Sequence, residues 1–87
     1  MDQLPYVYIL KCRDDTYYTG YTVEVDRRLQ EHQNGLASKY TRGRTPVELV
    51  YVEELPTKSA ALQRERELKR LTRANKQKVI ESARQSQ

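Results

Sequence analysis

Glu65 is a carboxylate in a segment whose apolar residues predict the buried face of a helix. It lies three residues after Leu62 and three before Leu68, so a helix here would place it within the apolar stripe. A carboxylate at the edge of a core is costly unless it is paired or binds a cation. The sequence therefore leaves two interpretations open: a cation site at Glu65, or an ion pair with Lys69 four residues on.

Arg28 and His32 are a second pair of reactive side chains, four residues apart and therefore on one face of a predicted helix. Val25 and Leu29 mark the apolar side of that helix, and Arg28 borders it. A guanidinium can stabilise negative charge on a phosphate, and an imidazole can accept a proton near neutral pH. The structural alternatives are an arginine whose stem covers apolar surface and a histidine with a purely structural role.

The chain has seven tyrosines but no phenylalanine or tryptophan, and most of the tyrosines fall within residues 6–21. A phenol is needed in place of Phe only where its hydroxyl meets a polar group. Tyr6 and Tyr8 share one face of a predicted strand. Tyr18 and Gly20 share one face of the next strand. Cross-strand aromatic packing would explain this pattern. A polar pocket would explain it as well, because Gly20 leaves room for a ligand or for close backbone approach.

The elements that must position these side chains follow from hydrophobic periodicity and helix-capping signals. Thr22 and Thr72 are the predicted N-caps of two helices. The order ββαβαα predicts an α+β domain, with a small three-stranded antiparallel sheet flanked by helices. The predicted elements are strands over 6–12, 17–22 and 47–54, helices within 23–35 and over about 58–71 and 73–84, and a loop over 36–46.

The predicted hairpin constrains how the tyrosines can meet. Tyr8 and Tyr18 share a sheet face only if the hairpin loop has an odd number of residues, because side chains alternate along a strand. An even number of residues would place the two tyrosines on opposite faces.

Length and composition indicate a globular protein: 87 residues, of which 37% are hydrophobic and 32% charged. We expect a single domain over 1–84 and a frayed tail over 85–87. The net charge of +4 favours a polyanionic partner. The single cysteine, Cys12, excludes an internal disulfide and suits a reducing cytoplasm. No apolar run approaches the ~18 residues of a membrane helix, and no signal peptide is apparent, so we expect a cytoplasmic location and no membrane partner.

Taken together and in this order, these residues resemble the motifs of the GIY-YIG nuclease domain, above all its small single-domain members. The tripeptide YVY at 6–8 stands where the family has its first motif, and YTG at 18–20 stands where it has its second. Arg28 follows at the spacing of the family's helix arginine, and 61–65 resembles the segment with the family's metal-binding glutamate. The resemblance covers roughly residues 5–80.

Three positions depart from the family's pattern. Tyr6 replaces the glycine of the first motif and would narrow the cleft. Thr19 replaces the isoleucine of the second motif. Tyr21 stands where some branches carry a lysine, so one phosphate contact or base is absent.

The resemblance implies cleavage of DNA phosphodiesters with one divalent cation, Mg²⁺ or Mn²⁺. Glu65 would hold the metal, and Tyr8 and Tyr18 would lie beside the scissile phosphate. The resemblance therefore implies that Tyr8 and Tyr18 share one sheet face, with Arg28 and Glu65 close by, and hence that the hairpin loop is odd. Arg28 would stabilise the transition state, and His32 stands where relatives carry Tyr or His. The general base stays open between Tyr18 and His32: a phenol near pKa ~10 needs a nearby cation to act at neutral pH, whereas an imidazole titrates there.

Two groups of basic residues are predicted to bind DNA phosphates, with RNA as the other polyanion. No zinc finger or helix-turn-helix is apparent, so we expect weak, salt-sensitive binding with little base readout. The substrate would then be structured DNA such as flaps or branches, or a protein partner would target the enzyme. Ordinary surface charge is the alternative. The predicted nucleic-acid-binding residues are Tyr6, then Lys39, Tyr40, Arg42 and Arg44, and a second group of Lys69, Arg70 and Arg73.

The sequence thus favours a metal-dependent DNA endonuclease. The second hypothesis is a non-catalytic module that binds nucleic acid on the same fold, and the third is a protein-interaction domain with a tyrosine face. The presence of the tyrosines, the arginine and the glutamate at the motif positions favours the first. The third would show no dependence on Mg²⁺ and little on salt.

Overall fold

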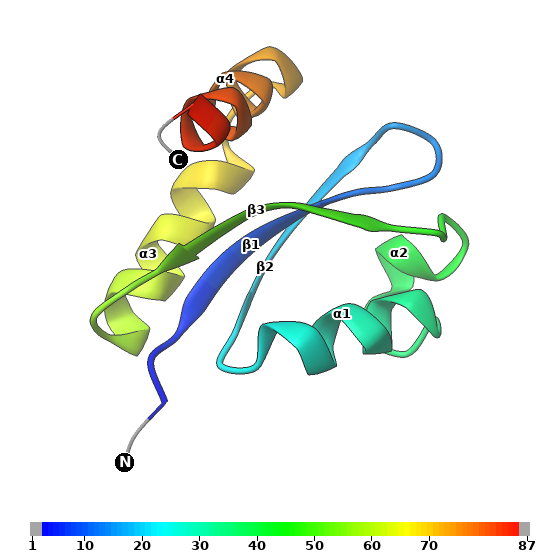
Figure 1. The fold of residues 1–87 in the computed structure, drawn as a ribbon, viewed down its shortest axis with the longest axis horizontal. Coiled ribbons are helices and arrows are strands. Elements are labelled where there is room, and N and C mark those ends of the chain that lie inside the picture. Colours follow the sequence, from blue (N-terminus) through cyan, green and yellow to red (C-terminus); the bar gives the residue numbers. More distant parts are fainter. Residues whose placement is uncertain (1–2, 86–87) are drawn as a thin grey trace.

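The computed structural model describes residues 3–85 and consists of a three-stranded antiparallel sheet with helices on both faces (Figure 1). The predicted α+β class is confirmed, and the element boundaries differ from the predicted ones by at most two residues. Residues 86 and 87 of the predicted frayed tail lie outside the described residues. The elements are β1 (Tyr6–Lys11), β2 (Tyr17–Thr22), α1 (Val25–Gln33), α2 (Lys39–Arg42), β3 (Glu48–Glu54), α3 (Lys58–Lys69) and α4 (Arg73–Gln85).

The observed order is ββααβαα, so the predicted order ββαβαα is wrong by one helix. The segment 36–46, predicted as a loop, contains the four-residue helix α2. The side chain of Ser38 caps this helix by accepting a hydrogen bond of 3.0 Å from the backbone N–H of Tyr40. A helix of one turn is too short to produce an apolar periodicity, so the sequence pattern could not reveal it.

The predicted N-caps have different outcomes. Thr72 accepts a hydrogen bond of 3.2 Å from the N–H of Asn75 at the start of α4, as a cap does. Thr22 is not the N-cap of α1, because that position belongs to Glu24, whose side chain makes no capping bond. Thr22 accepts instead from the backbone N–H of Glu24 at 3.1 Å, where the chain leaves β2.

The strand order β2-β1-β3 makes β1 the central strand. The connection between β1 and β2 covers residues 12–16, an odd number, and the register pairs Leu10 with Tyr18 and Tyr8 with Gly20. Paired residues share a sheet face, so Tyr8 and Tyr18 lie on the same side. The odd loop expected for the hairpin is confirmed. The predicted strand bounds, which leave only the four residues 13–16 between the strands, are wrong at Cys12, because Cys12 lies outside β1.

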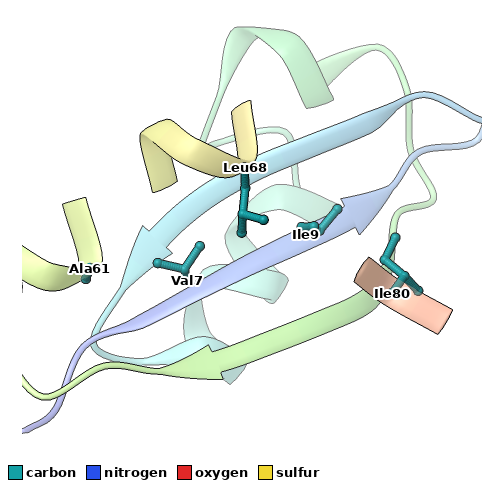
Figure 2. Packing of buried hydrophobic residues seen from close by; sticks show 5 residues of the cluster. All are labelled: Val7, Ile9, Ala61, Leu68 and Ile80. Atoms are coloured by element: carbon teal, nitrogen blue, oxygen red, sulfur yellow. The ribbon is translucent and has the colours of Figure 1, made fainter. Parts of the chain in front are cut away.

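The central strand is buried on both faces, and a separate apolar cluster covers each. Val7 and Ile9 pack under α3 and α4 against Ala61, Leu68 and Ile80 (Figure 2). Alternate residues of the strand point to the other face, where α1 lies. The members of that second cluster are Tyr8, Leu10, Cys12 and Val47, with Tyr18, Leu29 and Leu49 packed against them.

A half-buried polar group fixes α3 against β3. The Tyr51 hydroxyl donates a hydrogen bond to Glu53, and Arg64 Nε donates to the same carboxylate oxygen at 2.9 Å. Burial by itself raises the pKa of Glu53, but the hydrogen bonds from Tyr51 and Arg64 outweigh it, and the pKa lies below its ordinary value. Arg64 thereby links α3 to β3.

Among residues 3–85, no helix is long and apolar enough to span a bilayer.

We expect Glu53→Gln to destabilise the fold at neutral pH by about 1 kcal/mol, because a charged acceptor is replaced by a neutral one. A carboxyl group whose pKa is lowered by folding stabilises the protein above its unfolded pKa of ~4.3 and ceases to as the pH falls through the folded value. The difference in free energy of unfolding from wild type should therefore shrink below about pH 4. Urea denaturation at pH 7 and pH 3.5 measures this difference, with the exposed Glu54→Gln as the control. An equal difference at both pH values would contradict a stabilising role for the ionised Glu53 carboxylate.

Candidate active site

The phenol of Tyr8 lies directly over Gly20, its partner in the β1–β2 ladder. A Cβ atom added at Gly20 would lie 2.5 Å from the Tyr8 hydroxyl oxygen and 2.6 Å from Tyr8 Cζ. It would also lie 3.1 Å from Cε2 of Tyr18. Only glycine therefore lets the phenol lie across β2, an edge strand of the sheet. The space predicted for a ligand at Gly20 is occupied by Tyr8 itself.

Tyr8, His32 and Thr41 form a buried chain of hydrogen bonds. The Tyr8 hydroxyl oxygen lies 2.8 Å from His32 Nε2, and His32 Nδ1 lies 2.8 Å from Thr41 Oγ1. The three residues are 3%, 1% and 0% exposed, respectively, so solvent does not reach the imidazole. Strand β1, helix α1 and helix α2 each contribute one member. His32 is thus buried with both ring nitrogens hydrogen-bonded, as a structural histidine would be, and one of its partners is the motif residue Tyr8. Its predicted role as a base stays a prediction.

A row of rings leads outward from this chain. The ring centroid of Tyr18 lies 5.0 Å from that of His32 and 6.4 Å from that of Tyr8. Tyr40, on α2, follows at 5.9 Å from Tyr18, and Arg44 Cζ lies 4.2 Å over the Tyr40 ring. Tyr18 is half-buried, and its hydroxyl has no hydrogen-bond partner among residues 3–85. Of Tyr8 and Tyr18, it is therefore the one whose hydroxyl is available to a ligand.

The charges predicted to lie near the tyrosines act on the hydroxyl of Tyr8. Burial, with a smaller contribution from Tyr18, raises the pKa of Tyr8 well above its ordinary value. The cation of Arg28 opposes this shift, and the carboxylates of Glu65 and Glu31 add to it. Arg28 comes from α1 and Glu65 from α3, which packs against β2 on the opposite face. The two helices thus bring charges of opposite sign towards one phenol.

The imidazole of His32 is held neutral. Burial and the cation of Arg28 lower its pKa, and Glu31 opposes them only in part. A histidine whose pKa is lowered in this way is mostly uncharged at neutral pH. His32 can therefore accept a proton at neutral pH, but only from a group that it already touches.

Arg28 is half-exposed and forms an ion pair of 3.4 Å with Glu31. Glu31 also pairs with Arg27 at 3.5 Å, so one carboxylate holds two guanidinium groups on the same helix face. Sequence reasoning placed no role on Glu31. A cleft of about 260 Å³ opens beside Arg28, lined by Thr22, Val23, Glu24, Arg27, Arg28 and Glu31.

Glu65 is largely buried, with its side chain 18% exposed, and it forms an ion pair of 3.5 Å with Lys69. The apolar stripe around it is partly as predicted: Ala61 and Leu68 are buried, but Leu62 is exposed. The prediction for Leu62 is wrong because α3 contacts the sheet along a narrower line than the periodicity suggested.

The side chains present fit a cation that takes only one ligand from the protein and its remaining ligands from water and substrate. No group of three His, Cys, Asp or Glu side chains that could hold a metal occurs within residues 3–85. Mg²⁺ keeps most of its waters and commonly takes one or two carboxylates together with substrate phosphates. Glu65 supplies one such carboxylate, so a metal held there would need a phosphate group as well.

The predicted nucleic-acid-binding residues divide into two places. Tyr40 and Arg44 stack beside Tyr18, on the tyrosine face. Arg73 lies elsewhere, with Cζ 5.1 Å over the ring of Tyr17, which points to the α3 and α4 face. Of the other predicted residues, Tyr6 is half-buried. The rest are exposed: Lys39 and Arg42 on α2, Lys69 at the end of α3, and Arg70 after it.

Comparison with known proteins shows which family has these tyrosine and glycine motifs. A model of the GIY-YIG catalytic domain matches residues 4–78. The chain belongs to the GIY-YIG family. The predicted resemblance is confirmed, and the motif residues Tyr8, Tyr18 and Gly20 all lie at the β1–β2 ladder.

Several UPF0213 proteins are similar over most of this GIY-YIG chain. One from Natronomonas pharaonis is 59% identical over 75 residues, which are 86% of this chain and 88% of that protein. The solution NMR structure of a UPF0213 protein from Bacillus halodurans is 47% identical, with a TM-score of 0.59 over 88% of this chain and 82% of that one. A protein from E. faecalis, also solved by NMR, is 38% identical with a TM-score of 0.66 over 95% and 88%.

We expect Gly20→Ala to destabilise this GIY-YIG domain by about 1–3 kcal/mol, because the new methyl group must displace the buried Tyr8 ring. Gly43→Ala is the matched control, since a Cβ there meets nothing within 4 Å and the backbone φ is −98°. Urea denaturation compares the two variants with wild type. Equal stability of Gly20→Ala and Gly43→Ala would contradict the close approach described for Tyr8.

Proposed function

We propose that this protein is a metal-dependent DNA endonuclease that hydrolyses phosphodiesters, directed by DNA structure or only weakly by sequence. GIY-YIG family membership supports a nuclease with a nucleic-acid substrate. The observation that supports the proposal is the contact of two phenols with one imidazole, together with the action of the charges of Arg28 and Glu65 on the Tyr8 hydroxyl. These groups come from four separate elements, β1, β2, α1 and α3.

Glu65 would hold one Mg²⁺ or Mn²⁺ together with the scissile phosphate. When bound, such a cation supplies positive charge next to the phosphate oxygens and the leaving oxygen. In the protein alone, Lys69 neutralises Glu65. Cation affinity without DNA should therefore be low, since the metal competes with an ammonium group and has one protein ligand.

Tyr8 would accept the proton of the attacking water while passing its own proton to His32. The buried imidazole cannot touch water, but its Nε2 lies 2.8 Å from the Tyr8 hydroxyl. In this exchange Tyr8 is a neutral phenol before and after, and His32 becomes an imidazolium. The raised pKa of Tyr8 is then no obstacle, because no free phenolate has to form in advance.

Tyr18 and Arg28 would contact the phosphate. The unpaired hydroxyl of half-buried Tyr18 can donate a hydrogen bond to a phosphate oxygen or orient the water. The guanidinium of Arg28 stabilises charge that develops on the equatorial oxygens. This division of roles differs from the expectation of Tyr18 or His32 as the base, since the contact with His32 belongs to Tyr8.

The basic residues of α2 and Arg44 would hold the DNA backbone next to this site. They lie on the tyrosine face, at the outer end of the ring row. Few such contacts are present, so affinity should be modest and salt-dependent. This favours a substrate whose shape exposes a phosphate, such as a flap or branch.

The alternative is a module that binds nucleic acid without cutting it. The ion pair between Glu65 and Lys69 is the observation that favours this alternative, because it satisfies the carboxylate without a metal. A binder of this kind would need no divalent cation.

Cleavage of labelled single-stranded, duplex, flap and four-way-junction DNA, with and without Mg²⁺ or Mn²⁺, tests the proposal. Wild type should cut at least one branched form only with metal, and Glu65→Gln should lower the rate by about 10³ while DNA binding persists. Glu67→Gln is the matched control, since Glu67 lies on the same helix in an exposed ion pair with Arg64. Metal-independent cutting, or a Glu65→Gln variant as fast as wild type, would reject the metal assignment; binding without cleavage of any form would favour the alternative.

A further inference from the structure

Thr41 is the buried end of the hydrogen-bond chain, and nothing in the motifs assigns it a role. It is fully buried on α2, and its Oγ1 lies 2.8 Å from His32 Nδ1 and 3.4 Å from the carbonyl oxygen of Ser38. A carbonyl oxygen can only accept, so the Thr41 hydroxyl donates to Ser38. The Thr41 oxygen is then available to accept from His32 Nδ1–H.

The number of satisfied donors decides between the two forms of the imidazole. With the proton on Nδ1, all three donors have acceptors: His32 donates to Thr41, Thr41 to Ser38, and Tyr8 to His32 Nε2. With the proton on Nε2, His32 donates to Tyr8, and the Tyr8 hydroxyl proton has no acceptor among residues 3–85. Tyr8 is 3% exposed, and an unpaired buried donor is costly.

We propose that Thr41 is a positioning residue that holds His32 in the Nδ1–H form, so that Nε2 is free to take the proton of Tyr8. The Nε2–H form cannot accept that proton and would reverse the direction of the hydrogen bond. Thr41 thus acts through His32 and does not touch the substrate. The catalytic part of this inference rests on the proposed nuclease function, but the assignment of the tautomer does not.

The other groups that face the imidazole do not select the tautomer. Tyr18 contributes a ring contact, and the cation of Arg28 and the carboxylate of Glu31 act on the charge of His32 from α1. Neither charged group is hydrogen-bonded to a ring nitrogen, since both nitrogens are occupied by Tyr8 and Thr41. Thr41 is the partner of Nδ1 and therefore the group that places the proton.

His32 is the only histidine in the chain, so its ring nitrogens can be observed by ¹H–¹⁵N NMR without ambiguity. Wild type and Thr41→Ser should show the Nδ1–H form at neutral pH, because serine keeps the hydroxyl. Thr41→Val has nearly the same shape without a hydroxyl and should shift the tautomer ratio by about tenfold towards Nε2–H. An Nε2–H form in wild type, or the same tautomer in Thr41→Val as in wild type, would overturn the inference, and the wild-type spectrum decides even if the valine variant does not fold.

Cleavage assays test the catalytic part separately. Thr41→Val should lower kcat by about tenfold or more with little change in KM, and Thr41→Ser should restore it. A tautomer shift in Thr41→Val with wild-type kcat would overturn the positioning role. If wild type cuts no DNA but shows the expected tautomers, the proposed nuclease function fails while the placement of the His32 proton by Thr41 stands.

Discussion

The hydrogen bond between the Tyr8 hydroxyl and His32 Nε2 is the contact on which the site depends. It forms only because Gly20 has no side chain and the phenol can lie across the edge strand to reach α1. The β1–β2 register puts Gly20 opposite Tyr8 and Tyr18 on the same face. If β1 slipped by one residue in its pairing, Tyr8 would point to the opposite face of the sheet, into the other apolar cluster. The register of the hairpin therefore also determines whether Tyr8 can reach His32.

Most of the scaffold could be predicted from local patterns. Alternation in the three strands and helical spacing around Leu29 and Leu68 are strong signals, because each reports burial of one face. The convergence of Tyr8 and Tyr18 was expected from the family motifs, and strand parity added only the condition that the hairpin loop have an odd number of residues. The roles of Arg28 and Glu65 required the resemblance to a family, because a charged residue at helical spacing is as readily a surface ion pair as a catalytic group. Both side chains do form such pairs, with Glu31 and Lys69.

The features that sequence reasoning missed depend on contacts between distant segments. Helix α2 has a single turn and leaves no periodic signal, yet it delivers Thr41 to His32 and Tyr40 to Tyr18. A threonine in a basic segment is ordinary in sequence, and only tertiary packing shows that it meets an imidazole. The same short helix therefore joins the surface predicted to bind DNA to the buried end of the hydrogen-bond chain.

The most direct test of the account is the pH dependence of single-turnover DNA cleavage in Tyr8→Phe and Tyr18→Phe. Neutral His32 is required as the proton acceptor, so the wild-type rate should fall with acidity below about pH 6.5, with a midpoint lowered by burial. Tyr8→Phe should lose about 10² or more in rate together with that acid limb, and Tyr18→Phe should be slower but keep the limb. A Tyr8→Phe variant with the wild-type rate and acid limb would contradict the central claim.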